Sequence, residues 1–319
     1  MQTLLITRPI ADAVLEQARG LFDVTVHDGG PLSSSDAAQA LAAYDLILPT
    51  LGDMFDAAAF SGDVRCKMLG NFGVGYNHID VDAAAQAGVA VSITPDVLTD
   101  ATADIALTLL LATARRAGEG ERLVRAGKWG GFDVGGMLGT HVTGKTLGII
   151  GMGRIGQAIA ARCHYGFGMD VVFHNRSPKV TEVPATQLGS LNAVMAAADF
   201  VVVATPGGAG TTKLINAEAL AAMKPTGIFV NISRGEVVDE AALIDALEAG
   251  QITGAGLDVY EHGRTVNPRL RELSNVVLLP HMGSATHEGR VEMGEKVLIN
   301  IKTFDDGHRP PDLVIPSML

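Results

Sequence analysis

Arg234 and His281 are the side chains best suited to chemistry, because each directly follows an apolar, strand-like run. Such positions lie at the carboxyl end of a strand, where parallel α/β sheets bind ligands. A guanidinium can pair with a carboxylate and polarise a neighbouring carbonyl. An imidazole, with a usual pKa of about 6.5, can give a proton to a forming alkoxide at neutral pH. Two plainer interpretations stay open: Arg234 could pair with local acids such as Glu236, and His281 could be structural.

A third candidate segment is Gly73-Val74-Gly75-Tyr76-Asn77, which also follows an apolar run. Closely spaced glycines allow several backbone N–H groups to point toward one anion, such as a carboxylate. A tight turn without a ligand would use the same residue types. The segment is therefore a candidate anion site whose function the pattern alone leaves open.

A glycine motif, Gly151-x-Gly153-x-x-Gly156, links the apolar run 146–150 to the helix-forming residues 157–162. In a strand–turn–helix of this kind, Gly151 permits the sharp turn and Gly153 lets the backbone approach a pyrophosphate. Gly156 lets the helix pack closely on the strand. The N–H groups of the helix N-terminus also favour an anion. We therefore predict a dinucleotide site here, although a bare glycine motif can also be an ordinary turn.

The residues after the next predicted strand indicate which dinucleotide binds. Sites for NAD usually place an acid there to hold the ribose 2′-hydroxyl, but this chain has Asn175-Arg176-Ser177. An arginine and a hydroxyl suit a 2′-phosphate, which a carboxylate would repel. NADPH is therefore favoured, and NADH is the weaker alternative. Arg176 could also be no more than a solvated turn residue.

Strand-like and helix-like segments alternate along the whole chain, which predicts parallel sheets covered by helices. The strand-like runs are 4–7, 46–48, 68–71, 89–93, 146–150, 171–174, 200–204, 228–231, 254–257 and 276–279. Pro95 marks a plausible crossing between domains. Residues 118–145 are rich in glycine and contain the only tryptophan, Trp129, so we predict a long functional loop or an interface arm there.

Composition limits the classes of partner and the compartment. The chain has 319 residues, of which 47% are hydrophobic, and a net charge of −11, so neither nucleic acid nor an anionic membrane is an expected partner. Cys66 and Cys163 suggest no disulfide framework. No Cys/His cluster has the spacing of a metal site, and no segment resembles a secretory signal or a membrane span. A cytoplasmic protein is expected.

Five motifs in this order resemble the D-isomer-specific 2-hydroxyacid dehydrogenases, and within them the glyoxylate and hydroxypyruvate reductases. The motifs are Gly73-Val74-Gly75-Tyr76, Gly144-Lys145-Thr146-Leu147-Gly148 with the glycine motif, Asn231-Ile232-Ser233-Arg234-Gly235, Gly254-Ala255-Gly256-Leu257-Asp258-Val259 and Leu279-Pro280-His281-Met282-Gly283. The similarity covers essentially the whole chain. Pro206-Gly207-Gly208 also occurs in branches that act on larger substrates, so substrate size stays open.

The resemblance implies an α/β protein of two Rossmann-like or flavodoxin-like domains with the active site in the cleft between them. Residues 1–97 and 286–319 would form the substrate-binding domain and 98–285 the NAD(P)-binding domain. Val74 and Gly75 would bind the substrate carboxylate. Arg234 would orient the substrate, and His281 would donate the proton. The family is usually a homodimer.

The resemblance also implies a set of cofactor contacts along the nucleotide domain. Asp258 would contact the nicotinamide carboxamide. The further residues of this expected set are Thr102, Gly151, Gly153, Arg154, Ile155, Gly156, Asn175, Arg176, Ser177, Thr205, Pro206, Thr211, Ile232, His281 and Gly283.

One departure from the family pattern concerns the catalytic histidine. The family has a glutamate five residues after the Asp of the Leu-Asp-Val motif, where this chain has Gly263 followed by Arg264. That glutamate normally orients the histidine and favours its protonated form. We therefore expect reduction to fade at a lower pH than in relatives, and activity to be low. Glu261 could reach the histidine only if the loop refolds.

The expected function is an NADPH-preferring reductase of small 2-oxo acids, such as glyoxylate or hydroxypyruvate, that forms D-2-hydroxy acids. An alternative is a nucleotide-sensing binding protein on the same fold, with catalysis weakened at Gly263. A third is another dehydrogenase chemistry such as formate oxidation. A Pro-Gln-His arrangement would suggest the third, whereas this chain has Leu279-Pro280-His281.

Overall fold

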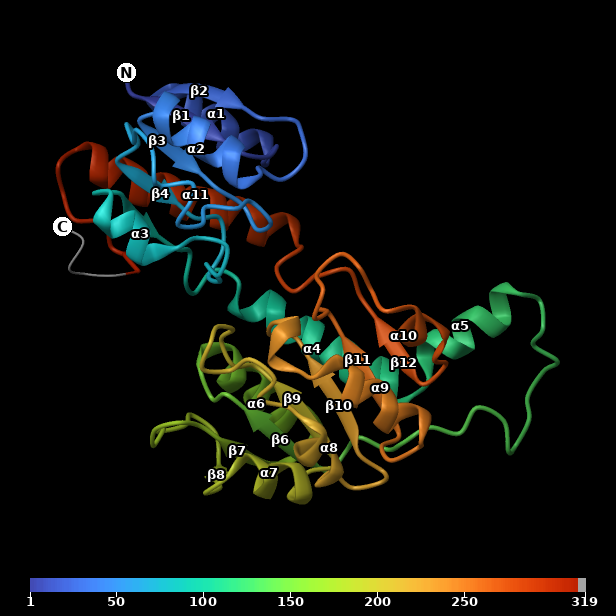
Figure 1. Ribbon diagram of the computed structural model, residues 1–319. Helices are drawn as coiled ribbons and strands as arrows, with labels where there is room; N and C mark the ends of the chain where they lie inside the picture. The colour runs from blue at the N-terminus through green and yellow to red at the C-terminus, as the bar shows by residue number, and fades with distance from the viewer. Residues whose placement is uncertain (315–319) are drawn as a thin grey trace. The chain divides into compact units, whose positions relative to one another are not determined.

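The computed structural model describes residues 1–314, which divide into two compact units (Figure 1). One unit contains Met1–Leu98 and the segment that begins at Ser284, and the other contains Thr99–Gly283. The last five residues of the expected substrate-domain segment 286–319 lie outside the described residues. Within residues 1–314, no helix combines the length and apolar character needed to span a membrane.

The first unit is built on a parallel five-stranded sheet with the order β2-β1-β3-β4-β5, which is the flavodoxin-like order. Its strands are β1 (Thr3–Ile6), β2 (Asp23–Val26), β3 (Leu46–Leu48), β4 (Met68–Gly70) and β5 (Ala90–Ser92). Its helices are α1 (Asp12–Leu21), α2 (Ser34–Ala43), α3 (Val81–Gln86) and α11 (His287–Asp305). Ser33 caps α2 through a reciprocal capping box with Asp36.

Helix α11 returns the chain to this first sheet and packs on β4 and α1. A Cβ atom on Gly70 would lie 2.8 Å from side-chain atoms of both Val297 and Ile301, so only glycine permits this close approach. The segment after α11 is then tied back, because Asn300 donates to the Asp312 carboxylate at 2.9 Å. The first unit is therefore completed by residues from the C-terminal part of the chain.

The second unit is built on a parallel seven-stranded sheet with the order β12-β11-β10-β9-β6-β7-β8. Its strands are β6 (Thr146–Ile150), β7 (Asp170–His174), β8 (Ala185–Gln187), β9 (Phe200–Val203), β10 (Ile228–Asn231), β11 (Gly254–Leu257) and β12 (Val276–Leu278). Its helices are α4 (Thr99–Ala114), α5 (Ala117–Arg125), α6 (Arg154–Phe167), α7 (Leu191–Ala197), α8 (Ala217–Ala221), the 3₁₀ helix η1 (Gly235–Val237), α9 (Glu240–Glu248) and α10 (Pro268–Glu272). Numbered from β6, this is the Rossmann order extended by one strand, with its switch point between β6 and β9.

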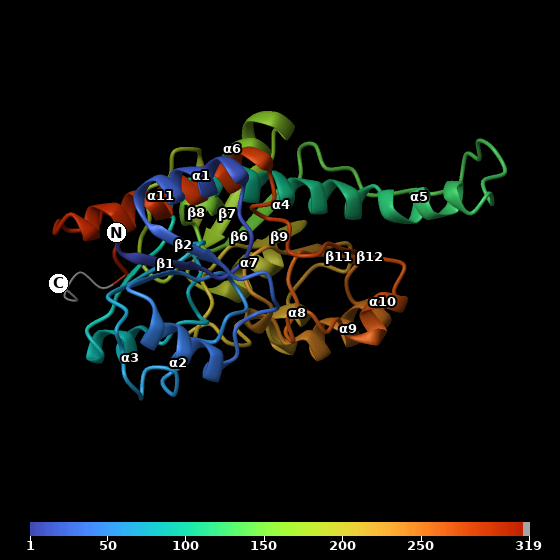
Figure 2. The same ribbon diagram turned by 90° about the horizontal axis from the view of Figure 1, so that it is seen from above.

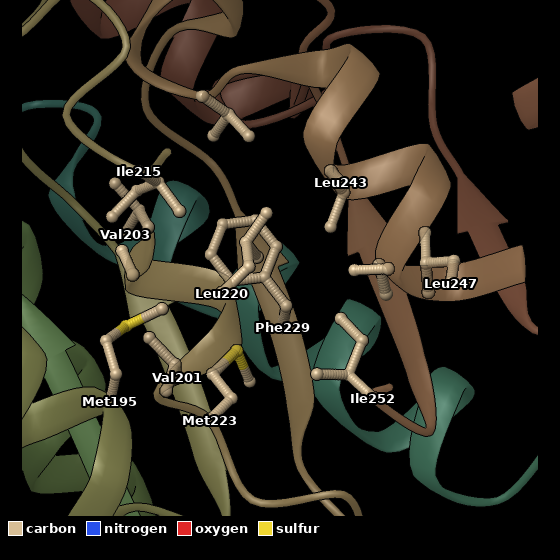
Figure 3. Close-up of a cluster of buried hydrophobic side chains, with 14 of the residues drawn as sticks. Met195, Val201, Val203, Ile215, Leu220, Met223, Phe229, Leu243, Leu247 and Ile252 are labelled. Atoms are coloured by element: carbon tan, nitrogen blue, oxygen red, sulfur yellow. The ribbon is translucent and has the colours of Figure 1, made fainter. Parts of the chain in front are cut away.

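Both faces of the seven-stranded sheet are covered, so its central strands are buried on each side. In β9, Val201 and Val203 point into one hydrophobic cluster, and Phe200 and Val202 point into the other. Figure 3 shows the first cluster, in which Phe229 lies among side chains of β9, α8 and α9. The sequences of the central strands are continuously apolar because these parallel strands are buried on both faces of the sheet.

The segment 118–145 differs from the loop that we predicted. Helix α5 occupies its first part, and α5 with the residues after it (117–138) extends away from the rest of the second unit as an arm (Figure 2). Arg116 breaks the helical path with φ 54° and holds the start of α5 through a bidentate pair with Glu119. Strands β2 and β8 were also not predicted, since their sequences lack a long apolar run.

Candidate active site

The glycine motif forms the turn between β6 and α6, and each glycine has a separate structural reason. Gly151 has φ 100°, and a Cβ there would lie 2.8 Å from the backbone N of Thr205. A Cβ on Gly156 would lie 2.3 Å from the Gly151 carbonyl oxygen. A Cβ on Gly153 would meet nothing within 4 Å, so the space beside this residue is open. This matches the three functions that glycines serve in a dinucleotide-binding turn.

The N-terminus of α6 adds the electrostatic part of that site. Gly153 is the N-cap and offers no capping side chain, and Arg154 and Ile155 are the first helical residues. The first N–H groups of a helix lack partners within the helix, so they can bind a phosphate. The turn therefore fits the pyrophosphate of a dinucleotide.

The turn after β7 is rigid and presents one cation to solvent. Asn175 donates from its side chain to the Ser177 carbonyl at 3.1 Å, and Gln187 donates to the carbonyls of both residues at 3.2 Å. Arg176 and Ser177 are exposed. Within residues 1–314, the Arg176 guanidinium forms no salt bridge. A fixed backbone with a free guanidinium suits recognition of a phosphate.

The loop after β9 lies beside the glycine turn, because Thr205 is the residue that Gly151 approaches. The Thr211 hydroxyl donates to the Pro206 carbonyl at 2.8 Å, which closes the loop on itself. Thr205, Pro206 and Thr211 therefore sit at the switch point of the sheet, where the crevice for a ligand is expected.

Arg234 follows β10 in a turn that Asn231 organises. The Asn231 carboxamide oxygen accepts from the backbone N and the hydroxyl of Ser233, and its nitrogen donates to the Arg234 carbonyl at 3.0 Å. The guanidinium donates to the Ser233 carbonyl at 2.7 Å, which uses one of five N–H donors. Burial lowers the pKa of Arg234, and Glu236 partly opposes that shift. A partly desolvated guanidinium with free donors is suited to binding a carboxylate.

Asp258 joins the strand that carries Arg234 to the turn that carries His281. Its backbone N donates to the Asn231 carbonyl at 3.0 Å. Its buried carboxylate accepts from the backbone N of Met282 at 2.7 Å and of Gly283 at 2.8 Å. Burial raises the pKa of the Asp258 carboxyl, while these two hydrogen bonds and the charge of His281 act in the opposite direction.

The turn after β12 holds His281 in an unusual backbone conformation, with φ 58°. A non-glycine residue in this region is uncommon and is often found at functional sites. A Cβ on Gly283 would lie 3.4 Å from both the Asp258 carboxylate and the side chain of Thr102 on α4. Thr102, Asp258 and Gly283 are therefore neighbours at one end of the sheet.

The loop after Asp258 contains the departure from the family pattern. Gly263 is exposed, has φ 59°, and nothing lies within 4 Å of where its Cβ would be. Glu261 does not take over there, because its carboxylate lies 3.3 Å from the Lys213 ammonium and accepts from the backbone N of Glu240 at 3.2 Å.

Val74 and Gly75 belong to the first unit, where Asn71 shapes their loop. The Asn71 side-chain nitrogen donates to the carbonyls of Gly73 at 3.0 Å and Gly75 at 3.1 Å. Gly73 has φ 154°. The loop is thus a built feature of the first unit and is held from inside by a buried amide.

The second unit places its expected residues at the carboxyl ends of neighbouring strands, apart from Thr102 on α4 and the exposed Gly263. Ile232 is buried directly after β10, one residue from the Asn231 turn. Sequence reasoning missed the importance of Tyr260, whose hydroxyl donates to the Leu279 carbonyl at 2.7 Å. Nothing in the sequence signals this bond, because it joins two strand ends.

Comparisons with known proteins agree with this geometry. A model of the D-isomer specific 2-hydroxyacid dehydrogenase, NAD binding domain, matches residues 107–283. The glyoxylate reductase of Thermococcus onnurineus is 43% identical over 323 residues, covering 99% of this chain and 96% of that protein.

Two solved structures are similar over nearly the whole chain. The TT0316 protein of Thermus thermophilus has a TM-score of 0.91 at 39% identity, covering 98% of this chain and 100% of that one. An NADPH-dependent glyoxylate/hydroxypyruvate reductase of Sinorhizobium meliloti, solved with NADP and malonate, has a TM-score of 0.87 at 35% identity, covering 98% and 96%. The chain therefore belongs to the D-isomer specific 2-hydroxyacid dehydrogenases, as an NAD(P)-dependent oxidoreductase of the glyoxylate/hydroxypyruvate reductase branch.

Proposed function

We propose that the protein is an NADPH-preferring reductase that converts small 2-oxo acids of the glyoxylate or hydroxypyruvate type to D-2-hydroxy acids. The observation that carries this is the placement of Asp258. Its backbone is bonded to the end of the Arg234 strand, and its carboxylate holds the His281 turn. An anion-binding group and a proton donor are thereby linked within the unit that carries the dinucleotide turn.

In the proposed mechanism, Arg234 pairs with the substrate carboxylate and polarises the 2-oxo carbonyl. The Val74–Gly75 segment of the first unit offers backbone N–H groups that suit a carboxylate. A nicotinamide cofactor held at the Gly151–Gly156 turn would supply the hydride that reduces C2. His281 gives its proton to the carbonyl oxygen, which becomes the hydroxyl, and the histidine then regains a proton from solvent. A well-placed general acid of this kind contributes about 10²–10⁴-fold.

Arg176 supports the preference for NADPH. It is exposed on a turn whose backbone is fixed by Gln187, and no carboxylate follows β7 within the next three residues. We expect Arg176→Asp to raise the KM for NADPH at least tenfold and to leave the KM for NADH within a few-fold. An equal change for both cofactors would contradict this assignment.

The arm supports a homodimer. Its exposed apolar side chains are Val124, Trp129, Phe132, Val134 and Leu138. Exposed apolar side chains gathered on one segment are typical of an interaction surface. A second copy of the chain is the partner we propose, and sedimentation of the wild type against Phe132→Ser with Trp129→Ser tests it. A wild-type monomer would contradict it.

The experiment that tests the function is a spectrophotometric panel of 2-oxo acids with NADPH and with NADH, run on the wild type and on His281→Gln. We expect NADPH-dependent reduction of glyoxylate or hydroxypyruvate that falls about 10²–10⁴-fold in the variant. The Glu261 carboxylate is engaged by Lys213 and residue 263 is a glycine, which favours a nucleotide-sensing protein as the second candidate. Tight NADPH binding without turnover across the panel would select that candidate.

A further inference from the structure

Tyr260 contacts both turns that carry the proposed chemistry. Its backbone carbonyl is packed against Gly235, where a Cβ would lie 1.8 Å from the carbonyl oxygen. Gly235 is the residue directly after Arg234. At its other end, the Tyr260 hydroxyl donates to the Leu279 carbonyl at 2.7 Å, two residues before His281. One side chain and its backbone thus bridge the Arg234 turn and the His281 turn.

The hydrogen bond from Tyr260 to Leu279 lies directly after the end of strand β12. Leu279 makes the last ladder bond of its strand, from its N to the Leu257 carbonyl at 2.8 Å. Pro280 follows and has no N–H to donate. The backbone then turns into the left-handed region at His281. A donor at the Leu279 carbonyl therefore holds the point from which the His281 turn departs.

Tyr260 is itself anchored by its neighbours on the other side. Glu261 donates from its backbone N to the Glu240 carboxylate at 3.0 Å, and Glu240 donates from its N to the Glu261 carboxylate at 3.2 Å. Glu240 is buried at the start of α9. This reciprocal pair fixes the loop to α9, so the position of the Tyr260 ring is set by the core and not by solvent.

We infer that Tyr260 is a positioning residue that holds the His281 turn in place relative to Arg234. The resemblance assigns the orientation of the histidine to a glutamate at residue 263, which is a glycine in this chain. The inference rests on the proposed function. The hydroxyl remains a donor at every working pH, because burial, with the charges of Asp258 and Glu240, raises the pKa of Tyr260 to about 12. The Asp258 carboxylate holds the backbone of His281, Met282 and Gly283, and the Tyr260 hydroxyl holds the carbonyl two residues before His281.

The test is Tyr260→Phe, which removes the hydroxyl and keeps the ring. The matched control is Tyr165→Phe, because Tyr165 is 71% exposed on α6. We expect kcat with glyoxylate and NADPH to fall about 3- to 10-fold in Tyr260→Phe, as for loss of one hydrogen bond. The KM for glyoxylate and the Kd for NADPH should stay within twofold. The control should match the wild type, and unchanged kcat in both variants would overturn the inference.

A second readout does not depend on turnover. In protein labelled with ¹³C-histidine, the His281 ring resonance is assigned by its loss in His281→Gln. We expect its chemical shift and titration midpoint to move in Tyr260→Phe and not in Tyr165→Phe. If the wild type reduces no 2-oxo acid, the proposed function fails while this measurement still decides the positioning role. An unmoved resonance would overturn that role whatever the activity.

Discussion

Two turns of the second unit contain glycine for opposite reasons. In the glycine turn, Gly151–Gly156, backbone atoms stand where the Cβ atoms of residues 151 and 156 would be, and at Gly156 the nearest is 2.3 Å from a Cβ. In the loop Asp258–Gly263, the last residue has a left-handed backbone but open space around it. Packing requires glycine at residues 151 and 156 of the first turn, whereas only the local backbone favours it at Gly263. Packing thus accounts for glycine at residues 151 and 156, and residue 263, where the resemblance implies a glutamate, has room for a side chain.

The first prediction compares two glycines of α6. Gly156→Ala places a methyl group against the Gly151 carbonyl, so the N-terminus of the helix must shift. We expect the Kd for NADPH to rise about 10- to 100-fold and the free energy of unfolding to fall by about 1–3 kcal/mol. Gly166→Ala on the same helix has nothing within 4 Å and should be neutral or stabilising by up to ~1 kcal/mol. Fluorescence titration and thermal unfolding measure both, and equal effects would refute the packing argument.

The second prediction concerns the carboxylate that holds the Asp258–Gly263 loop. Asp258→Asn leaves one acceptor for two backbone donors, those of Met282 and Gly283, so we expect a loss of about 1–3 kcal/mol at pH 7. Burial raises the pKa of Asp258 in the folded protein, so folding favours the protonated carboxyl. The free energy of unfolding of the wild type therefore falls as pH rises from 3.8 through the raised pKa. The variant should lack this slope.

Asp199 supplies the control of opposite sign. Burial opposes its ionisation, but the Lys224 ammonium and the backbone N of Thr146 keep the pKa of Asp199 below its usual value. Its contribution is therefore present above pH 3.8 and is lost as pH falls through the lowered pKa. Tm measured against pH should show opposite slopes for the two Asn variants relative to the wild type. Slopes of the same sign would contradict the assigned causes.

The smallest expected effect is at Gly263. Gly263→Glu introduces the carboxylate of the family pattern, and Gly263→Ala is its control. Both variants carry the same backbone strain, which is roughly 1–2 kcal/mol for a left-handed residue. We expect kcat/KM of the Glu variant to persist to higher pH than that of the Ala variant, with a few-fold difference near pH 8. If the two profiles coincide, the missing carboxylate has no bearing on catalysis in this chain.

Much of the fold could be predicted because buried parallel strands are continuous apolar runs. The predicted limits of four strands, β3, β6, β10 and β11, match those observed. Two short strands escaped prediction because β2 is only partly buried and β8 is mostly exposed, so tertiary pairing sets them. Helix α5 was hidden by Gly118 and Gly120, which weaken helix propensity.

The residues of the candidate site could be predicted only at positions where few other residue types could do the same thing. Gly156 and Arg234 stand out because few other residues could replace them. The contacts of Asp258 with Met282 and Gly283 depend on distances across strand ends, which spacing along the chain does not encode. Lys213 and Glu240 engage the Glu261 carboxylate in the same way, and no sequence pattern joins those three residues.

The discontinuous first unit has a consequence for how the protein acquires its structure on the ribosome. Val297 and Ile301 of α11 fill the space above Gly70 in β4, and Asp312 is bonded to Asn300. During translation, residues 1–98 emerge before α11 and stay without this cover until the whole intervening unit has been synthesised. The nucleotide-binding unit is contiguous and can fold in one stretch. Helix α11, which is synthesised after the nucleotide-binding unit, thus completes the unit that was begun before it.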